Sequence, residues 1–215
     1  MSKRRPLPVS VFQIPFVVRL PEHEPPFVWP ELFGRAGRVE IEIGMGKGLF
    51  LAGAAAARPE SNFLGVERAE KYFHRAVERF LEAPRPNARV LRADAFDLLT
   101  RWVTAGSVDD VHVYFPDPWP KSRHAKRRLL QPELFAGIAR ALRPGGRFWL
   151  GSDVAPYFAQ AVKETLALGE FDAEDWPDEA PDRILTSYAR KYLVEGRRLH
   201  YARFVRRDAS GGRKA

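Results

Sequence analysis

Short apolar segments alternate with segments of helical periodicity along most of this chain, and this pattern limits the fold more than any other feature. The apolar side chains Phe73, Ala76, Val77 and Phe80, for example, recur at the spacing of a helix packed on a sheet. Strands are expected at 39–43, 63–67, 90–93, 108–115 and 147–151, near residue 171, and at 199–205. Strands alternating with helices predict one α/β domain with an open, doubly wound, mostly parallel sheet of seven strands.

The two ends of the chain depart from this pattern. Residues 1–30 contain seven prolines and are expected to form an extended basic arm. The alternating segments occupy residues 31–207, a length typical of a single domain. Residues 208–215 are expected to form a disordered basic tail.

Composition excludes several classes of protein. The chain has no cysteine, which excludes disulfide scaffolds, thiolate nucleophiles and cysteine-ligated metal sites. Its five histidines lack the spacing of metal ligands, so no metal is expected. No apolar run is long enough to cross a bilayer, and the N-terminus does not resemble a signal peptide. We therefore expect a cytoplasmic protein with no membrane partner.

Basic residues gather in three parts of the chain. The last thirty residues hold nine lysines and arginines against two acids, Glu195 and Asp208. Residues 121–128 hold five basic residues and no acid, and the first twenty residues hold four and none. Three such clusters in one small domain indicate a polyanionic partner, because each phosphate contact releases counterions. Nucleic acid is the first candidate.

A glycine turn, residues 42–48, follows the first of the expected strands. Its glycines, Gly44, Gly46 and Gly48, let the backbone turn sharply and approach a ligand, and the next helix presents free amide groups. The turn lacks the Lys-Ser/Thr ending of a phosphate-binding loop, and its third glycine comes one residue early for the dinucleotide fingerprint. Alone, it is equally consistent with a structural role.

Carboxylates at the ends of three consecutive strands indicate more specifically that the glycine turn belongs to a ligand-binding site. Glu67 follows Gly48 by nineteen residues, where a carboxylate of this fold accepts hydrogen bonds from ribose hydroxyls. Asp94 is placed to accept from an adenine amino group, and Glu42 to pair with a ligand ammonium. A nucleoside with an amino-acid tail fits all three, and S-adenosylmethionine is such a molecule.

A stiff loop, residues 114–128, follows the fourth strand. Three prolines between residues 116 and 120 hold Asp117 at the mouth of the expected site. Trp119 offers a stacking surface and Lys121 a fixed positive charge. A rigid carboxylate, an indole and a polycation therefore meet at the ligand end of the sheet.

Residues 39–205, and the loop 114–128 above all, resemble the bacterial tRNA (guanine-N7)-methyltransferase family. The resemblance implies a Rossmann-like class I methyltransferase fold, S-adenosylmethionine as cofactor and tRNA as partner. The implied reaction is methyl transfer to N7 of a guanosine in the variable loop. Because N7 carries a lone pair and no proton, no general base is needed and positioning dominates. Asp117 is the expected catalytic residue, since its carboxylate can stabilise the growing positive charge and select guanine.

The resemblance also implies roles for individual residues. Those expected to bind the cofactor are Glu42, Gly44, Gly46, Glu67, Asp94 and Asp117, and those expected to bind substrate are Lys121, Asp153, Thr186 and Tyr188. The family carries a Thr-x-aromatic-Glu element near its C-terminus, but here the glutamate is replaced by Ala189. Glu195 lies six residues further on, too far to substitute without rearrangement.

Two other functions compete with this one. A proline-rich turn containing Asp117 is also typical of methyltransferases that act on an exocyclic base amine, and product analysis separates the two. An RNA-binding module that has lost its chemistry would bind the cofactor without turnover. A nicotinamide-dependent oxidoreductase is disfavoured by the glycine spacing. We expect a monomer or a weak homodimer.

Overall fold

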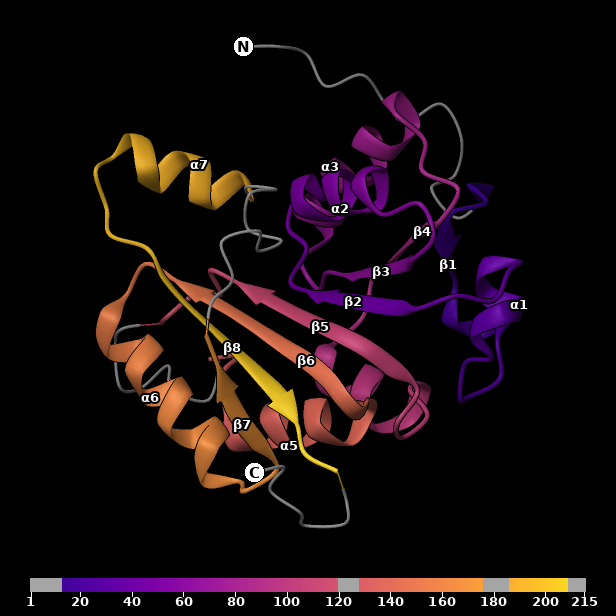
Figure 1. Ribbon diagram of the computed structural model, residues 1–215. Coiled ribbons are helices and arrows are strands. Elements are labelled where there is room, and N and C mark those ends of the chain that lie inside the picture. Colours follow the sequence, from indigo (N-terminus) through magenta and orange to yellow (C-terminus); the bar gives the residue numbers. More distant parts are fainter. Residues whose placement is uncertain (1–12, 120–127, 176–185, 209–215) are drawn as a thin grey trace.

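One sheet of eight strands runs through the residues that the computed structural model describes, which are 13–119, 128–175 and 186–208 (Figure 1). The strands are β1 (Val17–Val18), β2 (Val39–Ile43), β3 (Asn62–Val66), β4 (Ala88–Leu91), β5 (Val108–Tyr114), β6 (Leu142–Ser152), β7 (Phe171–Glu174) and β8 (His200–Arg206). Their order is β1-β4-β3-β2-β5-β6-β8-β7. All neighbours are parallel except β8, which runs antiparallel to β6 and β7. The predicted open, mostly parallel sheet is confirmed.

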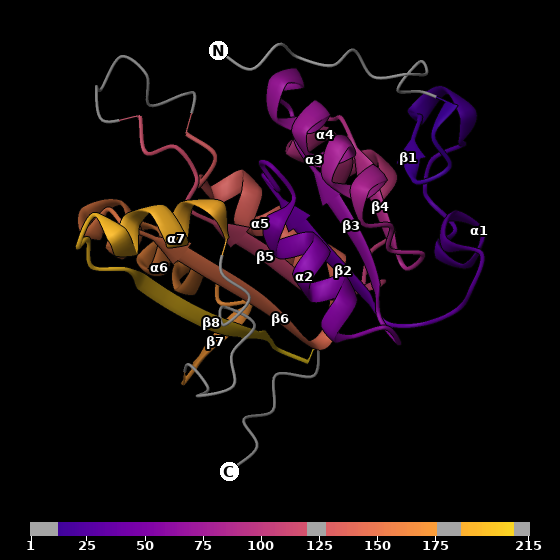
Figure 2. The ribbon, with the colours of Figure 1, turned by 90° about the horizontal axis from the view of Figure 1, so that it is seen from above.

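Helices cover both faces of this sheet. Helices α1 (Trp29–Phe33), α4 (Ala95–Asp97), α5 (Pro132–Ala141) and α6 (Ala155–Ala167) pack on one face, and α2 (Leu49–Ala57), α3 (Glu70–Glu82) and α7 (Ser187–Val194) on the other. Figures 1 and 2 show α7 and α6 on opposite sides of the sheet. The chain is therefore wound doubly, as the alternation predicts.

The central strand β2 has buried side chains on both faces, because it lies between two helical layers. Ile41 and Ile43 join the core beneath α5, whereas Glu40 points to the opposite face. There the Glu40 carboxylate accepts from Nε and Nη2 of Arg58, at 3.1 and 2.8 Å, and contacts His112 Nε2 at 3.0 Å. Burial raises the pKa of Glu40, but His112 and Arg58 outweigh it and lower the pKa to about 2.

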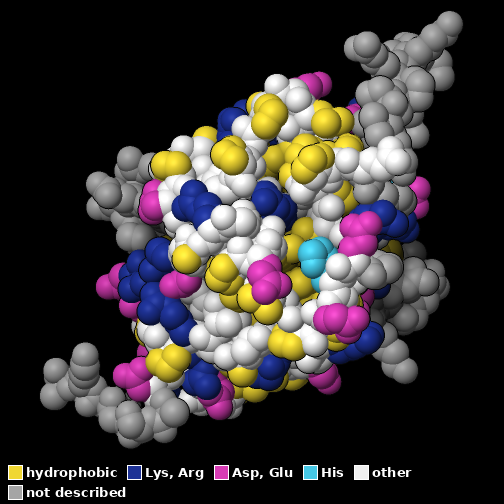
Figure 3. All heavy atoms as spheres, turned by 90° about the vertical axis from the view of Figure 1, so that its right-hand side faces the viewer, with side chains coloured by type: hydrophobic (Ala, Val, Ile, Leu, Met, Phe, Trp, Pro, Cys, Tyr) yellow, Lys and Arg dark blue, Asp and Glu magenta, His cyan; other side chains and the backbone are white. Residues whose placement is uncertain are grey.

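The segment expected to be an extended arm differs from this expectation where it is described. Val17 and Val18 form the edge strand β1 beside β4, and the amide of Val90 donates to the Phe16 carbonyl at 2.9 Å. A 3-10 turn (Leu20–Glu22) and α1 follow, and the Phe27 side chain is buried against the core. Apolar burial therefore attaches this segment to the sheet and adds its eighth strand. Figure 3 shows this side of the molecule, where basic and acidic side chains are interspersed.

The other differences from the expected elements are small. Between β4 and β5, the helical residues are divided between α4 and a π-helical turn, Leu98–Trp102. Strand β6 begins five residues before the expected start at Arg147, with a bulge opposite β5 where Pro144 and Gly145 lie. No helix within the described residues is long and apolar enough to span a membrane.

Candidate active site

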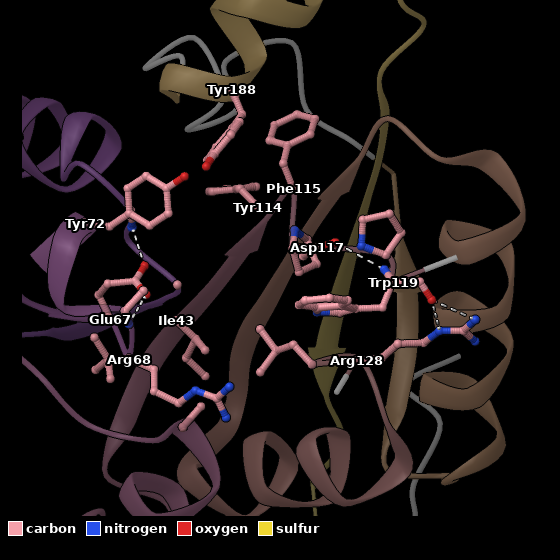
Figure 4. Close-up of a pocket in the computed structure, with 18 of the residues that line it drawn as sticks. Ile43, Glu67, Arg68, Tyr72, Tyr114, Phe115, Asp117, Trp119, Arg128 and Tyr188 are labelled. Atoms are coloured by element: carbon pink, nitrogen blue, oxygen red, sulfur yellow. Dashed lines mark hydrogen bonds between the residues drawn. The ribbon is translucent and has the colours of Figure 1, made fainter. Parts of the chain in front are cut away.

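A cavity of about 670 Å³ opens at the carboxyl edge of the sheet (Figure 4). The turns that follow β2, β3, β4, β5 and β6 line it, and α7 closes one side. This edge is where open α/β sheets bind ligands, and the volume is that of a small-molecule site.

The glycine turn after β2 forms one wall of the cavity. Gly44 and Gly46 adopt left-handed φ angles of 76° and 55°, a conformation that favours glycine. The amides of Gly44 and Met45 both donate to the Val66 carbonyl, at 2.8 and 3.0 Å, which ties the turn to β3. Gly44 and Gly46 therefore line the cavity with backbone that carries no Cβ atom.

Glu67, directly after β3, fixes the glycine turn from the other side. Its Oε2 accepts from the Gly46 amide at 3.0 Å, and its Oε1 accepts from the Ala69 amide at 2.7 Å. The carboxylate lies in the cavity wall, beside Tyr72 of α3. A carboxylate held by two amides is preorganised to accept from ligand hydroxyls.

Asp94, in the turn after β4, lies in the same wall. Its Oδ1 accepts from the Phe96 amide at 2.9 Å and so caps α4. Its Oδ2 lies 3.5 Å from Nη1 of the exposed Arg68, which also lines the cavity. Arg68 therefore adds a cation to this part of the site that sequence reasoning did not identify.

Asp117 lies in the cavity wall within a strained loop after β5. The non-glycine residues Phe115 and Trp119 flank it with φ angles of 52° and 40°. Such angles cost energy and persist where the surroundings impose them. Asp117 Oδ1 accepts from the Trp119 amide at 3.2 Å, and Arg128 donates to the Trp119 carbonyl from Nε and Nη2, each at 3.3 Å. Hydrogen bonds to both the amide and the carbonyl of Trp119 thus hold this part of the loop (Figure 4).

Glu42 lies outside the residues that line the cavity. Its side chain is 4% exposed, and its Oε2 has no hydrogen-bond partner among the described residues. Burial raises the pKa of Glu42 to about 8, and Glu67 acts in the same direction against a hydrogen bond from the Leu51 backbone. An orphaned, buried carboxyl beside the glycine turn is a site that a ligand cation would satisfy.

Of the described residues expected to bind substrate, Asp153 and Tyr188 line the cavity at different places, and Thr186 does not line it. Asp153 follows β6 and binds Arg197, whereas Tyr188 of α7 lies beside Tyr72. Burial raises the pKa of Tyr188, and the hydrogen bond to Tyr72 adds to this effect. Thr186 caps α7, because its Oγ1 accepts from the Ala189 amide at 2.9 Å.

Two further predictions concern Lys121 and the position of Ala189. Lys121 lies outside the described residues. Ala189 is only 1% exposed and packs in the core, so this position has no room for the family's glutamate without rearrangement.

Sequence reasoning missed several side chains of the cavity. Their contributions depend on which element folds over the sheet edge, and the sequence carries no local signal for that. These residues are Arg68, Tyr72, Phe115, Arg128, Tyr192 and Arg197.

An open sheet with one antiparallel strand, a glycine turn, and carboxylates after the next strands together define a class I methyltransferase. Residues 36–202 match the family model described as "Putative methyltransferase". The chain is 32% identical over 201 residues to the tRNA (guanine-N(7)-)-methyltransferase of Geobacter metallireducens, covering 92% of this chain and 95% of the relative. The chain belongs to the tRNA (guanine-N7)-methyltransferase family, as its resemblance indicated.

A second relative carries the same name, and a solved structure has a similar fold. The enzyme of the same name from Rhodopirellula baltica is 44% identical over 137 residues, which is 61% of this chain and about half, 51%, of that relative. Among solved structures, the 16S rRNA (adenine(1408)-N(1))-methyltransferase of Catenulisporales acidiphilia superposes with a TM-score of 0.62 at 19% identity, covering 86% of this chain and 92% of that one. At this identity the likeness concerns the fold alone.

Proposed function

We propose that this protein transfers a methyl group from S-adenosylmethionine to N7 of a guanosine in the variable loop of tRNA. The observation that carries the proposal is the position of Asp117. Its carboxylate shares one cavity with Glu67 and Asp94, on a loop whose backbone is strained at both sides of it. The family relatives carry this activity in their names.

The chain's own residues fit the cofactor. Glu67 would accept from its ribose hydroxyls, Gly44 and Gly46 would let its tail approach the backbone, and Asp94 would accept from its adenine amine. The unpartnered Oε2 of Glu42, which is buried behind the glycine turn and outside the cavity lining, would accept from the ammonium of the tail. When bound, the cofactor supplies an activated methyl group on a sulfonium.

Asp117 and the rigid loop around it would position the guanine. Because N7 has no proton, no residue has to act as a base, and holding the reacting atoms in line supplies most of the acceleration. The Asp117 carboxylate would accept from guanine N1 or the exocyclic amine and stabilise the positive charge that builds on the purine. Adenine offers no donor at N1, so the same contact selects guanine.

The end of the cavity at Asp153, here called the substrate end, would take the rest of the nucleotide. Tyr188, which lies beside Tyr72, and Thr186, which caps α7, would contact the RNA from the N-terminal end of that helix. Lys121 would neutralise a phosphate. The N7 edge is buried in the deep groove of duplex RNA, so the target guanosine must be unpaired or extruded.

Further features of the proposal follow from a tRNA substrate. We place the protein in the cytoplasm, as a monomer or a weak homodimer. Its basic clusters would contact the phosphates on both sides of the target, so binding should weaken steeply as salt rises.

Two tRNA transcripts test the proposal, one with guanine and one with 7-deazaguanine, which removes only the nucleophilic atom. Transfer of labelled methyl to the first and none to the second is expected. Equal transfer to both would indicate methylation of an exocyclic amine. Cofactor binding with transfer to neither transcript would indicate an RNA-binding module. Asp117→Asn should lose most of the transfer rate, and retention of the full rate would remove Asp117 from its catalytic role.

A further inference from the structure

Arg197 joins the turn after α7 to the end of β6 at the substrate end of the cavity. Its Nη1 lies 2.7 Å from Oδ2 of Asp153, whose side chain is 7% exposed. Its Nε lies 2.8 Å from Oε2 of Glu195, and its guanidinium stacks over the Tyr192 ring at 4.5 Å. Asp153, Tyr192 and Arg197 all line the cavity. One cation thus organises a carboxylate and an aromatic ring in the cavity wall.

The other end of α7 is attached in a different way. Ala189 is buried in the core, Tyr188 interacts with Tyr72 of α3, and the first turn of the helix contains no acidic residue. The carboxylate that the family places in this turn is therefore missing here. Glu195, at the opposite end of the helix, instead reaches the substrate end of the cavity through Arg197.

The charges at this end of the cavity show why a cation is needed. Burial raises the pKa of Tyr192, the charges of Asp153, Glu195 and Asp117 act in the same direction, and Arg197 acts against them. Arg197 is the cation that lies against this ring, at 4.5 Å. The guanidinium pairs with both Asp153 and Glu195, so it offsets part of this negative charge and fixes the Asp153 carboxylate in one orientation.

We propose that Arg197 is the positioning residue of the substrate end: it fixes Asp153 and Tyr192 against the cavity and ties α7 to β6. The Glu195–Arg197–Asp153 network supplies a carboxylate at the C-terminal end of α7, whereas the first turn of this helix has none. The inference rests on the proposed function, because Asp153 is taken to contact the guanosine.

Arg197→Ala and the neighbouring control Arg198→Ala test it, since both remove one cation from the same exposed turn. We expect Arg197→Ala to lower kcat at saturating tRNA at least tenfold, with KM for tRNA within threefold. Arg198→Ala should keep kcat at saturating tRNA within twofold, because losing a phosphate contact of the basic C-terminal cluster would change KM for tRNA. Arg197→Lys should recover part of the rate, because lysine keeps the ion pair and loses the planar fork.

Two further measurements separate positioning from phosphate binding. The double variant of Arg197→Ala with Asp153→Asn should be no slower than the slower single variant, because the two residues act as a unit. For Arg197→Ala, the slope of log KM for tRNA against log salt concentration should match that of the wild type. A slope reduced by about one, with kcat unchanged, would make Arg197 a phosphate contact and overturn the inference.

The outcomes also distinguish this inference from the proposed function. If Asp153→Asn lowers kcat tenfold and Arg197→Ala does not, the inference is wrong and the proposed function stands. If the wild type transfers no methyl group to tRNA, the proposed function is wrong, and hydrogen exchange then decides the structural part. In Arg197→Ala, amide exchange in residues 187–194 should be at least fivefold faster than in Arg198→Ala. Equal exchange rates would show that Arg197 does not attach α7 to β6.

Discussion

The Glu67 carboxylate and the Gly46 amide lie 3.0 Å apart, so the end of β3 holds the glycine turn that follows β2. The second carboxylate oxygen accepts from the Ala69 amide at 2.7 Å. One side chain therefore fixes the two backbone segments between which the proposed cofactor binds. Removing its charge should disturb the wall of the cavity and the ligand contact together.

Glu67→Gln should weaken binding of S-adenosylhomocysteine tenfold or more. The amide keeps one acceptor and turns a donor toward a backbone N–H, and hydrogen bonds to charged groups contribute about 1.5–3 kcal/mol. Isothermal titration calorimetry measures the loss. Glu70→Gln is the matched control, because Glu70 lies three residues away in an exposed ion pair with Arg92. Equal affinities of the two variants would contradict the role of Glu67.

Gly46→Ala should lower both stability and cofactor affinity. The residue has a φ of 55°, where a Cβ costs about 1–2 kcal/mol, and its amide is the one that Glu67 holds. Gly169→Ala is the control, since Gly169 has a φ of 71°, no atom within 4 Å of an added Cβ, and a position after α6. Chemical denaturation should show similar losses for both variants, whereas titration with S-adenosylhomocysteine should show a loss for Gly46→Ala alone. A Gly169→Ala variant that also loses affinity would refute this assignment.

The alternation of strands and helices was predictable from sequence because each central strand is buried on both sides. Strand β2 and helix α3 lie within a few residues of their expected positions, since local periodicity determines them. Strand β1 was not predictable: its two residues have no periodicity, and only pairing with β4 makes them a strand. The packing of residues 13–33 is set by tertiary contacts in the same way.

The candidate site was also predictable only in part, and only where local sequence determines the position of a residue. Glu67, Asp94 and Asp117 could be placed from sequence, because the topology puts the carboxyl ends of parallel strands at one edge. The buried position of Glu42 behind the glycine turn could not be predicted, because it depends on which face of β2 the side chain occupies. Arg197 could not either, since its pairing with Asp153 depends on how α7 returns over the sheet.

Two carboxylates on β2 should give opposite effects of pH on stability. The pKa of Glu42 is about 8 in the folded protein, above its ordinary value of 4.5, so the folded state binds more protons between these values. The free energy of unfolding that Glu42 contributes is therefore present below about pH 4.5 and is lost as pH rises through 8. Urea unfolding should show Glu42→Gln becoming progressively more stable than the wild type from pH 5 to 8.

Glu40→Gln is the matched comparison for this prediction. The pKa of Glu40 is about 2 in the folded protein, so its contribution is complete above pH 4.5 and is lost as pH falls toward 2. The Glu40→Gln variant should therefore be less stable than the wild type by an amount that stays constant from pH 5 to 8. A Glu42→Gln difference that is equally constant would show that the Glu42 carboxyl titrates normally.

Arg128→Ala should slow methyl transfer at least tenfold and leave cofactor affinity within threefold. The guanidinium donates twice to the Trp119 carbonyl, and Trp119 has a strained φ of 40° beside Asp117. Without this anchor, the loop can relax to an unstrained conformation and move the Asp117 carboxylate away from the guanine. Single-turnover rates at saturating tRNA measure the effect, because they exclude any loss of RNA binding. Arg101→Ala, which removes an exposed arginine paired only with Asp97 among the described residues, should keep the wild-type rate. An Arg128→Ala variant that slows only at subsaturating tRNA would instead assign Arg128 to RNA binding.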